Sequence, residues 1–157
     1  MRTGPPRQKS QERKVMRIVL KDAVSSAERD AMIAPLVAHN TAQGVNFTNT
    51  PFALALEDDG GNIVGGVTGY SRWGWLFLAS VAVPAQLRGQ GWGRRLIEAT
   101  ETAAVQRGCR YIWLDTYSFQ ARPFYEKLGY RVFGQLPDHP PGHTQFFMFK
   151  TLRSDTA

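Results

Sequence analysis

One stretch near the middle of the chain constrains the fold more than any other: an apolar run leads through a glycine-rich turn into a helix pattern. The apolar run ends at Pro84, and the turn holds Gly89, Gly91 and Gly93. The residues that follow carry apolar side chains at helical spacing until Gly108, a typical helix stop. A strand that passes through such a turn into a long helix is typical of domains that mix strands and helices.

The rest of the sequence predicts an antiparallel meander followed by alternating helices and strands. A capping box at Ser25–Glu28 starts a helix, and Pro35 inside it predicts a kink or two short helices. The turn Asp58–Asn62 between two apolar runs predicts a hairpin. The expected strands are residues 15–21, 52–57, 63–70, 75–83, 111–115, 130–136 and 145–152, and two further helices are expected at 91–107 and 121–128. The expected fold is α/β, with a mixed, mostly antiparallel central sheet flanked by helices.

Length and charge indicate one folded domain with a basic tail. The chain has 157 residues, of which 43% are hydrophobic, so residues 15–157 can form a single core without disulfide bonds. Residues 1–14 hold five basic residues and one acidic one, which accounts for +4 of the net charge of +6. This tail is predicted to be disordered, and Met16 is an alternative natural start. The remaining charge of +2 does not suggest a nucleic-acid partner.

Several classes of protein are excluded by what the sequence does not contain. Cys109 is the one cysteine, so neither a disulfide framework nor a multi-cysteine zinc site is expected, and no metal is predicted. The longest apolar stretch is shorter than the roughly 20 residues that a membrane helix needs. The first 15 residues lack the apolar core of a secretory signal. We therefore expect a cytoplasmic protein with no membrane partner.

The glycine-rich turn has the properties of an anion-binding site. Glycines allow close approach of the backbone, and the first amides of a helix are unpaired and favour negative charge. Arg88, Arg94 and Arg95 add positive charge. The spacing matches neither the phosphate-binding loop with its lysine nor the dinucleotide fingerprint. From these residues alone the ligand is a nucleotide, a dinucleotide or a coenzyme, and a turn without a ligand is the alternative.

Two sequence blocks resemble the GNAT superfamily of N-acetyltransferases. Arg88–Gly93 matches the R/Q-x-x-G-x-G/A signature for acetyl-CoA, and Ala121–Tyr130 is similar to the A-x-x-F-Y-E-K-x-G-F/Y block of that family. The spacing between the blocks, one helix and one strand, also agrees. The resemblance covers residues 15–152 and implies the GNAT fold, acetyl-CoA as cosubstrate and acyl transfer to an amine.

The resemblance implies how acetyl-CoA is held. The backbone of Val81 and Val83 would run beside the pantetheine arm, and amides from Gly89 to Arg94 would hold the pyrophosphate. A backbone amide near Val81 would polarise the thioester carbonyl. The residues implied in binding acetyl-CoA are Val81, Val83, Arg88, Gly89, Gln90, Gly91, Trp92, Gly93, Arg94, Arg95, Ser118 and Gln120.

Tyr125 aligns with the tyrosine that, in many relatives, protonates the departing CoA thiolate. A phenol with a pKa near 10 is a suitable general acid for a moderately basic thiolate. The alternative is an aromatic ring that packs beside Phe124. The sequence also departs from the family where many relatives carry an asparagine, because Ser118 stands seven residues before Tyr125. That contact is expected to be weaker or to come from Gln120.

The general base is the second departure from the family pattern. Many relatives carry a Glu or His on the strand before the turn, but Leu76–Ser80 contains neither. The protonated amine must lose a proton before it attacks. Asp115, Glu57 or a water chain could accept this proton, and Asp115 follows a strand near the expected thioester. Its alternative role is to order the following loop.

Other candidates have weaker support. Cys109 precedes an apolar strand and is expected to be buried and inert. His139 and His143 flank a proline-rich turn that could lean over the substrate, but they lack the carboxylates of a metal site. Trp73 and Trp75 are either a substrate platform or hairpin packing.

Together these features predict an acetyl-CoA-dependent N-acetyltransferase that uses direct attack by a primary amine. A small cationic amine, such as an aminoglycoside-type antibiotic or a polyamine, is the expected acceptor, with Glu57, Asp115 and Asp138 as candidate partners for its charge. The alternatives are a protein N-terminal or lysine acetyltransferase and a non-catalytic acyl-CoA-binding module. A homodimer is one option for the assembly.

Overall fold

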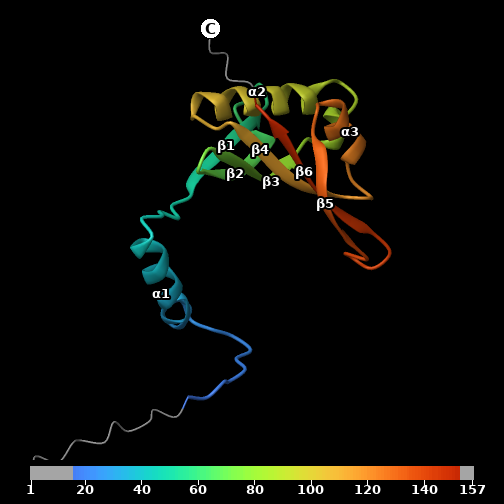
Figure 1. The fold of residues 1–157 in the computed structure, drawn as a ribbon. Helices are drawn as coiled ribbons and strands as arrows, with labels where there is room; N and C mark the ends of the chain where they lie inside the picture. Colours follow the sequence, from blue (N-terminus) through green and yellow to red (C-terminus); the bar gives the residue numbers. More distant parts are fainter. Residues whose placement is uncertain (1–15, 153–157) are drawn as a thin grey trace, which may run out of the picture. The chain divides into compact units, whose positions relative to one another are not determined.

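The computed structural model describes residues 16–152, which divide into two compact units, one ending at Asn46 and the other starting at Phe47. Both are drawn in Figure 1. The predicted tail, residues 1–14, lies outside the described residues, as does Val15.

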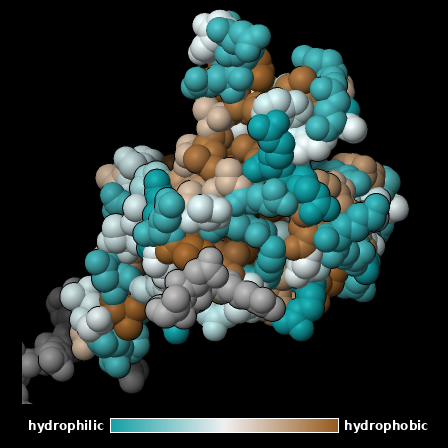
Figure 2. Space-filling view, turned by 90° about the horizontal axis from the view of Figure 1, so that it is seen from above, coloured by the Kyte–Doolittle hydropathy of each residue, from teal (hydrophilic) through white to brown (hydrophobic). Residues whose placement is uncertain are grey.

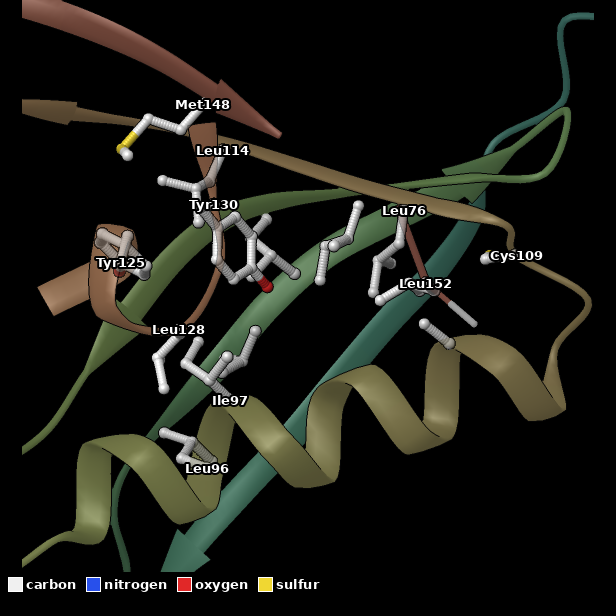
Figure 3. Close-up of a cluster of buried hydrophobic side chains, with 14 of the residues drawn as sticks. Leu76, Leu96, Ile97, Cys109, Leu114, Tyr125, Leu128, Tyr130, Met148 and Leu152 are labelled. Carbon is white, nitrogen blue, oxygen red and sulfur yellow. The ribbon is translucent and has the colours of Figure 1, made fainter. Parts of the chain in front are cut away.

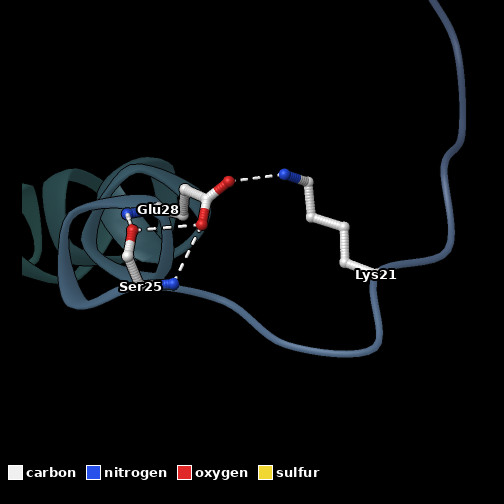
Figure 4. A network of polar contacts seen from close by, with 3 residues as sticks. All are labelled: Lys21, Ser25 and Glu28. Carbon is white, nitrogen blue, oxygen red and sulfur yellow. Dashed lines mark hydrogen bonds and ion pairs between the residues drawn. The ribbon is translucent and has the colours of Figure 1, made fainter.

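Residues 16–46 of the first unit contain one helix, α1 (Ser26–Ala42), and the predicted capping box fixes its start. The Ser25 hydroxyl accepts from the Glu28 amide at 3.2 Å, and the Glu28 carboxylate accepts from the Ser25 amide at 2.9 Å. Lys21 donates to the same carboxylate at 2.5 Å (Figure 4). Together these contacts pair amides that a helix start otherwise leaves open. Pro35 lies inside one continuous helix, so the option of two short helices was wrong; a proline removes one backbone donor and the flanking turns continue.

The strand predicted over residues 15–21 does not form in the described part of the chain. Residues 16–21 have no regular secondary structure, and no described strand pairs with them. Alternating apolar residues such as Ile18 and Leu20 fit a strand only where a neighbouring edge accepts them. An alternating apolar pattern alone is therefore not sufficient for a strand.

The second unit is built on a six-stranded sheet with the order β1-β2-β3-β4-β6-β5. All neighbouring strands are antiparallel except β3 and β4, so the predicted mixed, mostly antiparallel fold is confirmed. The strands are β1 (Thr50–Glu57), β2 (Ile63–Arg72), β3 (Trp75–Ala82), β4 (Tyr111–Tyr117), β5 (Arg131–Pro137) and β6 (Thr144–Thr151). The predicted hairpin between β1 and β2 is confirmed, and Asp58 closes its turn by accepting from the amides of Gly60 and Asn62, both at 2.9 Å.

Two helices of the second unit contribute buried side chains to a common core with the sheet. They are α2 (Trp92–Gln106) and α3 (Arg122–Lys127), and a 3₁₀ turn, η1 (Ala85–Leu87), precedes α2. Leu96 and Ile97 of α2 belong to the same cluster of buried side chains as Leu76 and Leu114 of the sheet (Figure 3). Figure 2, seen from above, shows hydrophilic side chains with hydrophobic ones between them. The buried residues of α2 are Leu96, Ile97, Thr100 and Ala104, as expected for an amphipathic helix that buries its apolar side on a sheet.

Cys109 is buried at the edge of this core, as predicted. Its side chain is 5% exposed, and burial is the main cause that raises the pKa of its thiol. A raised pKa keeps the group as a thiol at neutral pH, and the thiolate is the reactive form. This environment is that of a packing residue.

Candidate active site

Strands β3 and β4 run side by side for four residue pairs and then separate. Their parallel pairing joins Trp75–Leu78 to Tyr111–Leu114 and ends there, although β3 continues to Ala82 and β4 to Tyr117. Each strand keeps its outer neighbour along this part, β2 for β3 and β6 for β4. The two inner edges therefore face a gap with backbone groups that the sheet does not pair. Such edges can hydrogen-bond an extended ligand as an added strand would.

A bulge in β3 coincides with the point of separation. The register between β2 and β3 shifts so that Thr68 pairs with Ser80 while Gly69 pairs with Leu78, which leaves Ala79 as the extra residue. A Cβ atom on Gly69 would overlap the carbonyl oxygen of Phe77, so the close approach here requires glycine. Bulges bend a strand and redirect its edge, which explains why β3 leaves β4 at this position.

The gap opens into a cleft of about 880 Å³, which lies within the usual size of roughly 300–1,000 Å³ for ligand pockets. Four segments surround it: the end of β3, the turn before α2, the end of β4 with its following loop, and α3. The lining residues include Ser80, Val81, Val83, Arg88, Gly89, Gly91, Gly93, Arg94, Asp115, Gln120 and Tyr125. The cleft thus brings together most of the residues that the sequence indicated, although they come from distant parts of the chain.

The glycine turn has the backbone shape that the sequence suggested. Gly89 and Gly91 have φ values of 72° and 82°, a region that residues with a Cβ rarely adopt. Gly91 is the N-cap of α2, and no side chain caps the helix there. A Cβ on either glycine would meet nothing within 4 Å, so space beside both is open to a ligand. Gly93 differs, because its Cβ would lie 3.2 Å from the Phe124 ring.

The basic residues of the turn divide into two groups. Arg88 and Arg94 line the cleft, and Arg94 also lies 3.6 Å from Glu98 in an exposed ion pair. Arg95 instead lies over the Trp92 ring, 4.2 Å from its centroid, and neither residue lines the cleft. Gln90 bonds the Gln86 carbonyl at 2.8 Å and steadies the turn. Gln90, Trp92 and Arg95 are therefore not among the residues that line the cleft.

Tyr125 lies on α3 and lines the cleft. It is 8% exposed, and its ring packs edge-on against Phe124 and Tyr130 at centroid distances of 5.1 and 5.7 Å. Burial, and secondly the negative charge of Asp115, raises the pKa of Tyr125 to about 12. The phenol is therefore neutral and holds its proton at physiological pH.

Asp115 lines the same cleft from β4. Its side chain accepts a hydrogen bond from the Gln145 side-chain amide at 2.8 Å, and Gln145 belongs to the neighbouring strand β6. Asp115 and Tyr125 line the same cleft, and the negative charge of Asp115 is the second cause of the raised pKa of Tyr125. The cleft thus places a proton donor and a carboxylate together.

Gln120 and Ser118 lie in the loop between β4 and α3, and they differ in whether they line the cleft. Gln120 lines the cleft and accepts hydrogen bonds at 3.2 Å from the Thr116 hydroxyl and the Tyr117 amide. Ser118 does not line the cleft: its hydroxyl lies 3.2 Å from His143 and accepts from the Thr144 amide. Of the two residues, Gln120 is the one positioned to meet a ligand.

This arrangement resembles known acetyltransferases in both sequence and structure. The model of the acetyltransferase (GNAT) family matches residues 14–130. The chain belongs to this GNAT family. A blasticidin-S acetyltransferase of Streptomyces morookaense is 40% identical over 93 residues, which are 59% of this chain and 68% of that protein. An acetyltransferase of Agrobacterium fabrum is 31% identical over 121 residues, covering 77% and 88%. The crystal structure of a Bacillus cereus acetyltransferase has a TM-score of 0.75 at 33% identity and covers 85% of this chain and 98% of that one.

GNAT acetyltransferases use acetyl-CoA as acetyl donor. A solved Bacillus anthracis acetyltransferase with the same fold, at a TM-score of 0.58 and 19% identity over 71% of this chain and 68% of that one, is in complex with acetyl coenzyme A. In the present structure the open strand edges suit an amide-rich arm, and the uncapped helix start with Arg88 and Arg94 suits a pyrophosphate.

Several cleft residues of this GNAT protein were not indicated by its sequence. Phe119 and Lys127 both line the cleft, as do Ser80 and Tyr117. Lys127 lies in the second family block, two residues after Tyr125, and adds a positive charge. This position in the block could have indicated that it lies near the site. Ser80 and Tyr117 lie on the strand ends that separate, and that separation is not visible in a sequence pattern.

Other residues that the sequence singled out lie elsewhere. Glu57 and Asp138 do not line the cleft, and Asp138 accepts from the Gly142 amide at 2.7 Å. Trp73 packs edge-on against Phe47 at 4.6 Å, while Trp75 stacks on Tyr111 at 4.4 Å. Both tryptophans line a second, smaller cavity of about 160 Å³. Their ring contacts correspond to the packing option.

Two further features are absent from the described residues. Within residues 16–152 no group of three or more His, Cys, Asp or Glu side chains is arranged to hold a metal ion. Over the same range, no helix has the length and apolar character to span a membrane.

Replacement of Gly91 tests the turn as the pyrophosphate site. Both Gly91→Val and Gly91→Asn add a Cβ in the open space, but asparagine tolerates positive φ far better than valine. If the ligand approaches this backbone closely, both variants should weaken acetyl-CoA affinity by about tenfold or more in calorimetric titration. Gly108→Asn is the matched control, because Gly108 has a φ of 78° and open space but lies beyond the other end of α2. A folded Gly91→Asn variant with unchanged affinity would contradict the assignment.

Proposed function

We propose that this chain is an acetyl-CoA-dependent N-acetyltransferase that transfers the acetyl group by direct attack to a primary amine of a small molecule. The observation that carries the proposal is that one cleft holds the open strand edges, the positively charged helix start, Tyr125 and Asp115. Donor binding and proton transfer need these groups within reach of one another.

The donor would lie along the separated strands with its anionic end at the helix. Backbone groups of Val81 and Val83 would bond the pantetheine arm, and the amides from Gly89 to Arg94 would bond the pyrophosphate. Arg88, Arg94 and Lys127 supply positive charge at the lining of the cleft. This arrangement leaves the thioester near the point where β3 and β4 separate.

The chemistry would then need two proton transfers. The neutral amine attacks the thioester carbonyl, whose developing negative charge a backbone amide near Val81 would stabilise. The ammonium proton passes to Asp115, directly or through water, and the Tyr125 hydroxyl protonates the sulfur as the carbon–sulfur bond breaks. The products are an acetamide and CoA with its thiol protonated. Asp115 then loses the proton that it accepted, and the Tyr125 phenolate regains one through solvent, so atoms and charge balance. A phenol that is neutral at working pH is ready to donate.

A cationic antibiotic-like amine is the acceptor that the relatives favour. The 40% identical relative is a blasticidin-S acetyltransferase, which makes a small antibiotic the first class of acceptor to test. Asp115 supplies a negative charge inside the cleft for a protonated amine. Blasticidin S and a polyamine are therefore the first compounds to assay.

A panel of amines tests the proposal through release of the CoA thiol. The full chain is incubated with acetyl-CoA and blasticidin S, an aminoglycoside, a polyamine, an N-terminal peptide or a lysine peptide. We expect turnover with one or more small cationic amines and none with the peptides. Turnover of the peptides alone would indicate a protein acetyltransferase, and acetyl-CoA binding without turnover of any amine would indicate a binding module. Either result overturns the proposal.

The pH dependence of kcat provides a further test. A raised pKa means that the folded protein favours the neutral phenol, so Tyr125 keeps its proton until the pH approaches about 12. At saturating substrates we therefore expect kcat to rise as the amine loses its proton, with no alkaline decline caused by Tyr125 up to about pH 10. A decline of kcat at alkaline pH with a midpoint below pH 9, if Tyr125→Phe removes it, would contradict this expectation. It would show that Tyr125 loses its proton at a pH well below about 12.

A further inference from the structure

Gln145 lies at the start of β6, where it reaches across to β4. Its Cα is opposite Tyr117, while Asp115 is opposite Phe147, so Gln145 and Asp115 are diagonal neighbours on one face of the sheet. The Gln145 side-chain nitrogen donates to the Asp115 Oδ2 atom at 2.8 Å. Gln145 is 9% exposed.

Gln145 differs from the other buried polar residues among residues 16–152, which are Thr100 and Thr116. Thr100 donates to the Leu96 carbonyl of its own helix, and Thr116 donates to Gln120 in the following loop. Both hydrogen bonds are local in sequence. Gln145 instead joins two strands, 30 residues apart in sequence, at a carboxylate that lines the cleft. A buried amide is costly unless it is hydrogen-bonded, so its partner is the reason that it is tolerated there.

We propose that Gln145 is a positioning residue for acetyl transfer, which holds one oxygen of the Asp115 carboxylate so that the other is presented to the acceptor amine. This inference rests on the proposed function. An amide suits the task because it orients the carboxylate without cancelling its charge. A lysine or arginine at the same place would pair with Asp115 and compete with the cationic acceptor.

A double-mutant cycle tests this role. Gln145→Met keeps a side chain of similar length and removes the donor, and we expect it to lower kcat/KM for the amine by about 10- to 100-fold, the range for a hydrogen bond to a charged group. The affinity for acetyl-CoA should stay unchanged. In an Asp115→Asn background the same replacement should cost less than about threefold, because no carboxylate remains to be positioned. Gln135→Met, at an exposed site on β5, is the matched control.

Two results would overturn the inference. If the losses of kcat/KM from the two single replacements multiply in the double variant, Gln145 acts independently of Asp115. A loss of acetyl-CoA affinity as large as the loss of kcat/KM would show a general effect on the cleft.

An NMR measurement keeps the inference testable even if Gln145→Met fails to fold. The chemical shifts of the Gln145 side-chain amide protons in the wild-type chain should change in Asp115→Asn. Unchanged signals would show that the hydrogen bond does not form. This NMR result does not depend on turnover. If the chain is inactive with every amine but the hydrogen bond is intact, the proposed function fails while the contact between Gln145 and Asp115 stands.

Discussion

Replacement of Tyr125 by phenylalanine is expected to lower kcat by roughly 10²- to 10⁴-fold, the usual contribution of a general acid. Phenylalanine keeps the ring that packs against Phe124 and Tyr130 and removes only the hydroxyl. The departing thiolate then has to take its proton from water. Because the loss arises in the chemical step, affinity for acetyl-CoA should change little.

Steady-state kinetics with a thermal melting curve distinguishes this role from a structural one. Tyr111→Phe is the matched control, because Tyr111 stacks on Trp75 and does not line the cleft. A kcat for Tyr125→Phe within about threefold of wild type would mean that Tyr125 is not the acid. A lower melting temperature with preserved turnover would assign the hydroxyl a structural role instead.

The second large effect is expected in the core, where Ile97→Ala should lower the free energy of unfolding by about 2–5 kcal/mol. Ile97 is fully buried at 0% exposure, and it lies between α2 and the sheet (Figure 3). Alanine removes apolar contacts and leaves a cavity that the sheet can close only in part. Because α2 also supplies the helix start in the cleft, acetyl-CoA binding should weaken at temperatures where the variant begins to unfold.

Ile63→Ala provides the matched control for Ile97→Ala. Ile63 is 71% exposed at the start of β2, so the same chemical change should alter stability by less than about 0.5 kcal/mol. Urea denaturation of the full chain measures both free energies. Equal losses in the two variants would contradict the placement of Ile97 in the core.

Local sequence signals predicted most of the fold because they are set by short-range physics. The capping box at Ser25, the Asp58 turn and the glycine stops at Gly108 and Gly129 all act within a few residues. The strand predicted at residues 15–21 failed because pairing with another strand depends on long-range contacts. Periodicity reports which face of a segment is apolar and does not report whether a partner edge is available.

The same distinction holds for the cleft. Arg88, Gly91 and Tyr125 could be predicted because they belong to two sequence blocks that resemble a known family, and all three line the cleft. The hydrogen bond from Gln145 to Asp115 could not be predicted, because its partners come from strands that are 30 residues apart. The separation of β3 from β4 depends on a bulge opposite Gly69, which only the register of the strands reveals.

A single-turnover reaction tests most directly whether the cleft transfers acetyl groups to small amines. The full chain is mixed in excess over acetyl-CoA, a cationic small amine is added, and the masses of the protein and of the amine are followed over time. Direct attack predicts that the amine gains one acetyl group on nitrogen while the mass of the protein never changes. An acetylated protein that forms before the amine reacts, or acetyl-CoA that stays bound and intact with every amine, would contradict the account.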